Sequence, residues 1–151
     1  MDNKKIKNNN KDNNNENDNN FFQDGLDSEI SKYIEFISNN ENEAIYRIIQ
    51  NEDSNNSKKI MDDGLLISLI DSYSSFSNFF ISKINKENNS LSISIKLTSF
   101  GLIKDDKEYI MKVKINHEDK KFIQYEVNIF DKENNLIKNA THLKKFVKAK
   151  F

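Results

Sequence analysis

Residues 62–85 read DDGLLISLIDSYSSFSNFFISKIN. The apolar residues of this stretch recur at steps of three and four, which predicts a helix with one apolar face. That face consists of Leu66, Leu69, Ile70, Tyr73, Phe76, Phe80 and Ile84. The opposite stripe consists of Ser68, Asp71, Ser72, Ser75, Asn78 and Ser82. The sequence therefore predicts a long buried helix with a small polar face.

This polar face lacks the charges expected of a surface in contact with water. Asp71 is the only acidic or basic residue from Gly64 to Ser82, although 31% of the chain is charged. A solvated face in a lysine-rich chain would carry Lys and Glu, so the serines favour close packing against another surface, such as a partner subunit. A membrane span is disfavoured, because six serines, Asn78 and Asp71 fall within nineteen residues.

The composition limits the class of protein. A chain of 151 residues can form one domain with its own core. The absence of cysteine excludes disulfides and thiolate metal sites, and it permits a reducing compartment. The net charge of -1 gives no electrostatic preference for nucleic acid. No metal site is predicted, because His117 and His142 are far apart and lack an acidic motif at ligand spacing.

The first 20 residues differ from the rest of the chain. They contain ten asparagines, and only Met1 and Ile6 are apolar. Such a segment buries too little to offset its ordering entropy, so residues 1–20 are predicted to be a disordered tail and 21–151 a single domain. We see no targeting signal in this tail, and a cytoplasmic protein is expected.

Two short segments precede the central helix. Residues 21–31 contain an Asp-Ser start signal and predict a short helix. Residues 33–38 and 43–50 flank a polar Asn-Asn-Glu-Asn turn, which favours a β-hairpin. The alternative is one amphipathic helix over residues 27–38, and periodicity alone leaves both open.

After the helix, apolar residues alternate with polar ones. This period of two predicts strands around residues 91–97, 109–115, 123–129 and 136–147, with Leu91, Ile93, Ile95 and Leu97 on one face of the first strand and Ser92 and Ser94 on the other. The links at residues 116–120 and 131–135 are short and polar, so the strands should pair antiparallel in sequence order. The predicted fold class is α+β, with one long helix on an antiparallel sheet that curls to cover it.

The stretch DDGLLISLID, residues 62–71, resembles the His-Gly-Gly-x-x-x-x-Leu-x-Asp opening of the central helix in hotdog-fold acyl-CoA thioesterases. These belong to the thioesterase superfamily and include phenylacetyl-CoA thioesterase-like proteins. The order of elements is also similar over roughly residues 33–146. The resemblance implies a hotdog fold, in which a curved antiparallel sheet wraps a long helix. It also implies hydrolysis of an acyl-CoA to free fatty acid and CoA, with CoA as part of the substrate and no cofactor.

The resemblance assigns catalytic roles residue by residue. Asp71 falls on the carboxylate that acts as general base or nucleophile, and Ser92 on a hydroxyl residue that helps hold the attacking water. Asn56 falls where a side-chain amide lies near the substrate carbonyl. The backbone N–H groups at Asp63 and Gly64 would form the oxyanion hole, because amide donors at a helix N-terminus can stabilise a tetrahedral intermediate.

Asp62 and Asp63 depart from the motif, because they replace its His and first Gly. An Asp63 carboxylate that points inward would oppose the developing oxyanion, whereas one that points outward would act as a helix cap. The sequence leaves both open. It also leaves open a degenerate hotdog domain that binds acyl-CoA or a partner protein without turnover.

Basic residues gather near the C-terminus. His142 matches a family position near the CoA channel, and residues 138–151 contain five lysines and no acid. We expect His142, Lys138, Lys144 and Lys145 to lie where the phosphates of CoA bind. The alternative is a solvated edge strand that is protected by its lysines.

The resemblance also implies assembly. In this family the acid of the helix in one subunit faces the loop amide of the other, so Asp71 should lie near Asn56 of a second copy. The serine stripe should then lie close to the interface. We expect a homodimer with two equivalent sites, or a homotetramer built from two such dimers.

Overall fold

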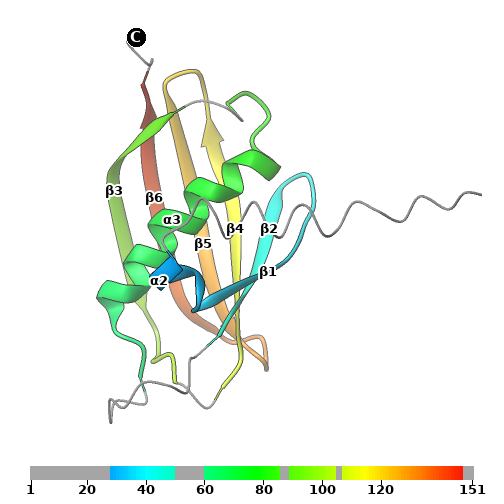
Figure 1. Cartoon of the computed structure of the whole chain (residues 1–151), viewed down its shortest axis with the longest axis vertical. Helices are drawn as coiled ribbons and strands as arrows, with labels where there is room; N and C mark the ends of the chain where they lie inside the picture. Colours follow the sequence, from blue (N-terminus) through cyan, green and yellow to red (C-terminus); the bar gives the residue numbers. More distant parts are fainter. Residues whose placement is uncertain (1–27, 50–59, 86–88, 105–106, 148–151) are drawn as a thin grey trace, which may run out of the picture.

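The computed structural model describes residues 28–49, 60–85, 89–104 and 107–147. Within them, one long helix lies across one face of a six-stranded antiparallel sheet (Figure 1). The helices are α2 (Ser28–Ser31) and α3 (Asp63–Ile81). The strands are β1 (Ile34–Asn39), β2 (Glu43–Ile48), β3 (Ser90–Ser99), β4 (Tyr109–Glu118), β5 (Phe122–Asp131) and β6 (Leu136–Phe146). The α+β class is confirmed, while the predicted tail, residues 1–20, lies outside the described residues.

The strands pair in the order β1-β2-β4-β5-β6-β3, and every neighbouring pair is antiparallel. The predicted β1–β2 hairpin is confirmed, and the alternative helix over residues 27–38 is wrong. Pairing in sequence order is confirmed for β4, β5 and β6, which are joined by short turns.

The position of β3 was predicted wrongly, because it pairs with β6 and not with β4. The chain leaves β2, crosses the sheet face as α3 and reaches the far edge, where β3 begins (Figure 1). As a result, β6 lies inside the sheet between β5 and β3. The edge-strand alternative for residues 138–151 is therefore wrong over the described residues 138–147.

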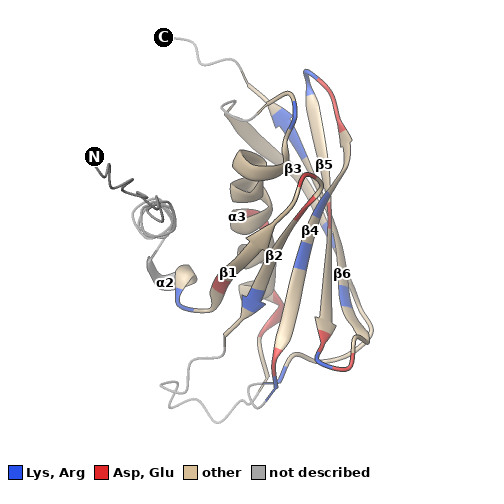
Figure 2. Cartoon of the chain, turned by 90° about the vertical axis from the view of Figure 1, so that its right-hand side faces the viewer, with Lys and Arg blue, Asp and Glu red and all other residues tan. Residues whose placement is uncertain are grey.

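The apolar face of α3 forms the core with the inward side chains of the sheet. Leu66, Leu69 and Ile70 are no more than 1% exposed, and Tyr73 is 3% exposed. Burial of each large apolar side chain contributes about 1.5–3 kcal/mol. In the side view, α3 lies against one face of the sheet and is largely free of charged residues, which gather on the strands and at the turns (Figure 2). The predicted amphipathic helix is therefore confirmed.

The last residues of the predicted helix do not belong to it. α3 ends at Ile81, because Ser82 has an extended backbone with φ -70° and ψ 137°. The Glu118 carboxylate on β4 then accepts hydrogen bonds from the Ser82 hydroxyl and from the Lys83 and Ile84 N–H groups. Ile84, predicted on the buried face, is 56% exposed.

The polar stripe of α3 divides into two parts. Ser68 is exposed, and Asp71, Ser72 and Ser75 are half-buried. Asn78 and Ser82 are instead buried within the chain itself, so the expectation that they face a partner subunit is wrong. The Asn78 amide donates to the Asn85 carbonyl at 2.6 Å and accepts from the Tyr125 hydroxyl at 3.2 Å, which satisfies a polar group that would be costly to bury alone. In the described ranges, no helix is both long and apolar enough to cross a membrane.

Candidate active site

A β-bulge turns Ser92 toward the central helix. Ser92 on β3 pairs with Lys144 on β6 and Ser94 pairs with Leu143, so Ile93 is an extra residue. In a regular strand, Ser92 and Ile95 would point to opposite faces of the sheet. The extra residue shifts this alternation by one, so Ser92 points inward together with Ile95 and Leu97. The predicted shared face of Leu91, Ile93, Ile95 and Leu97 is wrong for this reason. Leu91 is 59% exposed and Ile93 is 53% exposed.

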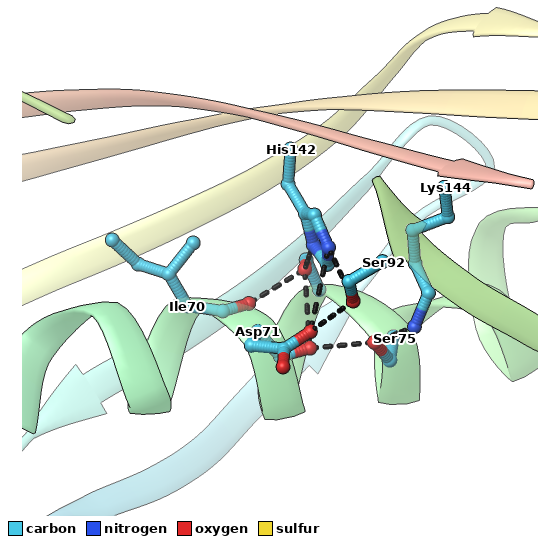
Figure 3. A network of polar contacts seen from close by, with 7 residues as sticks. Ile70, Asp71, Ser75, Ser92, His142 and Lys144 are labelled. Atoms are coloured by element: carbon cyan, nitrogen blue, oxygen red, sulfur yellow. Dashed lines mark hydrogen bonds and ion pairs between the residues drawn. The ribbon is translucent and has the colours of Figure 1, made fainter. Parts of the chain in front are cut away.

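Asp71, Ser92 and His142 meet between the middle of α3 and strands β3 and β6 (Figure 3). The Ser92 hydroxyl donates to Asp71 Oδ1 at 2.7 Å, and His142 Nε2 lies 3.3 Å from the same oxygen. Nε2 also lies 3.0 Å from Ser92 Oγ. Among the described residues, no partner contacts Asp71 Oδ2, and the Asp71 side chain is 47% exposed. One carboxylate oxygen is therefore held, while the other can accept a hydrogen bond from water.

His142 is a neutral histidine in this cluster. Its side chain is fully buried, and burial, assisted by the nearby Lys144 ammonium, lowers its pKa to about 4 although Asp71 opposes the shift. The other ring nitrogen, Nδ1, lies 2.6 Å from Ser74 Oγ. The Ser74 hydroxyl donates to the Ile70 carbonyl oxygen at 2.5 Å, so the ring proton lies on Nδ1 and is donated to Ser74 Oγ. Nε2 is then an acceptor beside the Ser92 hydroxyl, which donates to Asp71 Oδ1.

Lys144 lies on the same face of β6 and is 6% exposed. Its ammonium donates to the Ser75 hydroxyl, which in turn donates to the Asp71 carbonyl oxygen at 2.5 Å (Figure 3). Burial lowers the pKa of Lys144, and the nearby Asp71 charge opposes this effect. The polar network therefore contains one half-exposed acid, one neutral histidine and one buried lysine.

The N-terminus of α3 lies about two helical turns from Asp71. Asp62 caps the helix there, since its Oδ1 accepts from the Gly64 N–H at 2.8 Å. A Cβ on Gly64 would lie 2.8 Å from that same carboxylate oxygen, so the close cap favours glycine at this position. Lys138 Nζ lies 2.9 Å from Asp63 Oδ1. The Asp63 carboxylate is thus paired with a cation.

The structure brings some of the predicted site residues together and separates others. Ser92 lies against Asp71, while Asn56 lies outside the described residues. Of the four residues expected at the CoA phosphates, Lys138, His142 and Lys144 are buried beneath α3, and Lys145 is exposed. Among the described residues, no group of three or more His, Asp or Glu side chains could hold a metal ion.

Sequence reasoning missed the contacts between His142, Lys144 and the helix. The alternation along β6 is the signal that could have found them, because residues 138, 140, 142 and 144 must share one face of a strand. Ser74 and Ser75, which contact His142 and Lys144, carry no signal of their own among the many serines of α3.

No protein-family model matches this chain, and no curated protein matches it either. Solved structures do. Thioesterase superfamily member 2 of zebra fish matches with a TM-score of 0.71 at 14% identity, over 84% of this chain and 91% of that one. A thioesterase of Haemophilus influenzae matches with a TM-score of 0.71 at 10% identity, over 87% and 90% of the two chains. A hypothetical thioesterase of Streptococcus pneumoniae, solved with coenzyme A, matches with a TM-score of 0.65 at 16% identity, over 81% and 93%.

These matches span most of each chain, but at such low identity they carry information on the fold and not on the chemistry. They agree with the architecture described above, in which one long helix packs on a curved antiparallel sheet. The chain therefore has the hotdog fold of thioesterase superfamily members.

Proposed function

We propose that this protein is an acyl-CoA thioesterase, with Asp71 as the general base. The observation that carries the proposal is the arrangement of Asp71, in which Ser92 and His142 contact Oδ1 and Oδ2 is left for water. The hotdog fold supports thioester chemistry, and the Streptococcus pneumoniae neighbour solved with coenzyme A supports an acyl-CoA as the substrate.

The proposed reaction needs a base, an oxyanion hole and a leaving group. Asp71 Oδ2 takes a proton from water as the water oxygen attacks the thioester carbonyl carbon. In a site shared by two chains, the tetrahedral oxyanion accepts from the Asp63 N–H of the second chain, because Asp63 and Asp71 of one helix lie about two turns apart. Asp62 already engages the Gly64 N–H. Collapse of the intermediate breaks the C–S bond, and the CoA thiol leaves with a proton from the Asp71 carboxyl.

A panel of acyl-CoA substrates tests this proposal. Purified protein should release free CoA, detected with a thiol reagent, from at least one of the short-, medium- and long-chain substrates. Asp71→Ala should abolish the release. Glu133→Gln, which removes an exposed acid in the β5–β6 turn, is the matched control and should retain it. If the unmutated protein releases no CoA across the panel, the enzyme proposal is wrong.

A hotdog domain that binds acyl-CoA or a partner protein without turnover is the second candidate. It is favoured by the start of α3, where Asp62 engages one expected oxyanion donor and Asp63 adds a carboxylate beside the other. Isothermal titration calorimetry separates the two candidates. Stable binding of intact acyl-CoA, with no free CoA after incubation, would favour the binding domain.

We further propose that the protein is a homodimer. β3 forms an edge of the sheet, and its outward side chains Leu91 and Ile93 are more than half exposed. An apolar edge strand is a surface on which a second chain can pair or pack. Light scattering should give twice the chain mass, or four times if two dimers associate. Leu91→Lys combined with Ile93→Lys should lower the mass to that of one chain.

A further inference from the structure

An ion pair between a buried lysine and a half-exposed aspartate lies at the start of α3, outside the Asp71 cluster. Lys138 on β6 is 3% exposed, and its Nζ donates to Asp63 Oδ1 at 2.9 Å and to Ser99 Oγ at 2.7 Å. A buried ammonium is costly unless a carboxylate and hydrogen bonds compensate it. Asp63 supplies this carboxylate, and no second carboxylate in the described part of the chain lies within 4.0 Å of Lys138.

The two partners differ in how firmly they are held. Lys138 is anchored in an internal strand, where it pairs with Ser99 on β3. The Asp63 side chain is 57% exposed in the first turn of α3. The buried ammonium therefore determines where the carboxylate lies. If Lys138 were replaced by an apolar residue, water would still solvate the Asp63 carboxylate, because more than half of this side chain is exposed.

The location of this pair is relevant to the oxyanion hole proposed above. After Asp62 has engaged the Gly64 N–H, the Asp63 N–H is the donor proposed for the oxyanion. The side chain of the same residue carries a negative charge, which opposes a second negative charge nearby. A bonded ammonium cancels most of that charge, and it also draws the carboxylate toward the interior face of β6.

We propose that Lys138 is a positioning residue of the oxyanion hole, which neutralises the Asp63 carboxylate and holds it away from the thioester oxygen. This inference rests on the proposed thioesterase function. It explains how the acidic residue Asp63 can lie beside the position where the oxyanion forms. Lys138 acts through Asp63 and touches no substrate atom.

Two single variants separate an electrostatic role from a structural one. Lys138→Met removes the ammonium but keeps a long side chain in the buried position, so kcat should fall at least tenfold with little change in KM. Asp63→Asn removes the opposing charge, while its amide oxygen can still accept from Lys138, so kcat should stay equal or rise. The double variant should return to the level of Asp63→Asn. High salt should restore part of the activity of Lys138→Met, because salt screens the exposed carboxylate.

If the Lys138–Asp63 ion pair only stabilises the first turn of α3, the variants should show a different pattern of activity. Both single variants would then lose activity alike, in step with a lower unfolding temperature, and the double variant would not recover. Lys114→Met is the matched control, because it breaks the ion pair of the half-exposed Lys114 with Glu43 at 3.4 Å, away from α3, and it should leave kcat unchanged.

Equal losses in Lys138→Met and Asp63→Asn, or an unchanged kcat in Lys138→Met, would overturn the proposed role of Lys138. If the unmutated protein releases no CoA, the thioesterase proposal itself fails and this role fails with it. The two kinds of failure are distinguished by the unmutated protein alone.

Discussion

His142 links the chemistry of the site to the stability of the fold. Its pKa in the folded protein is about 4, against 6.5 for an ordinary histidine, because burial and Lys144 disfavour the imidazolium. The unfolded chain therefore binds a proton that the folded chain does not between these two values, and stability falls as pH decreases through this window. At about 1.4 kcal/mol per pKa unit, the effect has an upper limit of about 3.5 kcal/mol.

Urea unfolding at pH 7 and pH 4.5 measures this effect. The unmutated protein should lose more stability on acidification than His142→Gln, because the variant has no imidazole to protonate. The NMR titration of the His142 ring should show no protonation down to about pH 5. A ring that titrates near 6.5, or equal acid losses in both proteins, would contradict the buried neutral histidine.

At the residue scale, the sequence indicated some members of the site and not their contacts. Asp71 stands out because it is the only charge in a long serine-rich segment, and Ser92 follows from the family resemblance. The orientation of Ser92 depends on the bulge at Ile93, and the alternation of apolar and polar residues in this strand does not predict that bulge. The burial of Lys144 could not be predicted for a different reason. The chain is rich in lysine, and any one lysine in such a chain is expected to be solvated.

At the element scale, the C-terminus of α3 depends on one distant side chain. Glu118 on β4 accepts from the Ser82 hydroxyl and from the N–H groups of Lys83 and Ile84, and the Asn85 amide lies 3.2 Å from it. Glu118→Ala would leave these donors without their acceptor and should destabilise the protein by about 1–3 kcal/mol. Glu133→Ala, in an exposed turn, is the matched control and should change stability little.

The Glu118 effect should also depend on pH. Burial raises the pKa of Glu118, but the hydrogen bonds from Ser82, Lys83 and Asn85 outweigh burial, so the folded pKa is lower than that of an ordinary glutamate. Its contribution is therefore present above the unfolded pKa and lost as pH falls through the folded pKa. Equal stability of Glu118→Ala and the unmutated protein at neutral pH, measured by urea unfolding, would contradict this role.

The spacing of apolar residues along the sequence predicted most elements well, since α3, the hairpin and the strands β4, β5 and β6 lie where they were expected. Two features could not be predicted from this spacing. The helix ends at Ile81 because of Glu118, which lies 36 residues beyond Ser82 in the chain. The pairing of β3 with β6 depends on how α3 carries the chain across the sheet, and local alternation contains no information on that path.

At the scale of the whole molecule, the dimer proposal predicts complementation between two inactive variants. If Asp71 of one chain works with Asn56 of the other, a mixed dimer of Asp71→Ala and Asn56→Ala chains retains one intact site. Unfolding the two proteins together in urea and refolding them should restore up to about one quarter of normal activity, because half of the dimers are mixed and each has one of two sites. Folded dimers that stay inactive after mixing would contradict the shared site.

Asp71 is the residue that we propose activates water for attack on the thioester. The most direct measurement is the rate of CoA release by the unmutated protein and by Asp71→Asn, with the acyl-CoA that the panel identifies as the best substrate. The amide keeps the shape of the carboxylate but cannot take a proton, so kcat/KM should fall by about 100-fold or more, as expected for loss of a general base, with an unchanged unfolding temperature. Equal rates for the two proteins would contradict the role of Asp71 as general base.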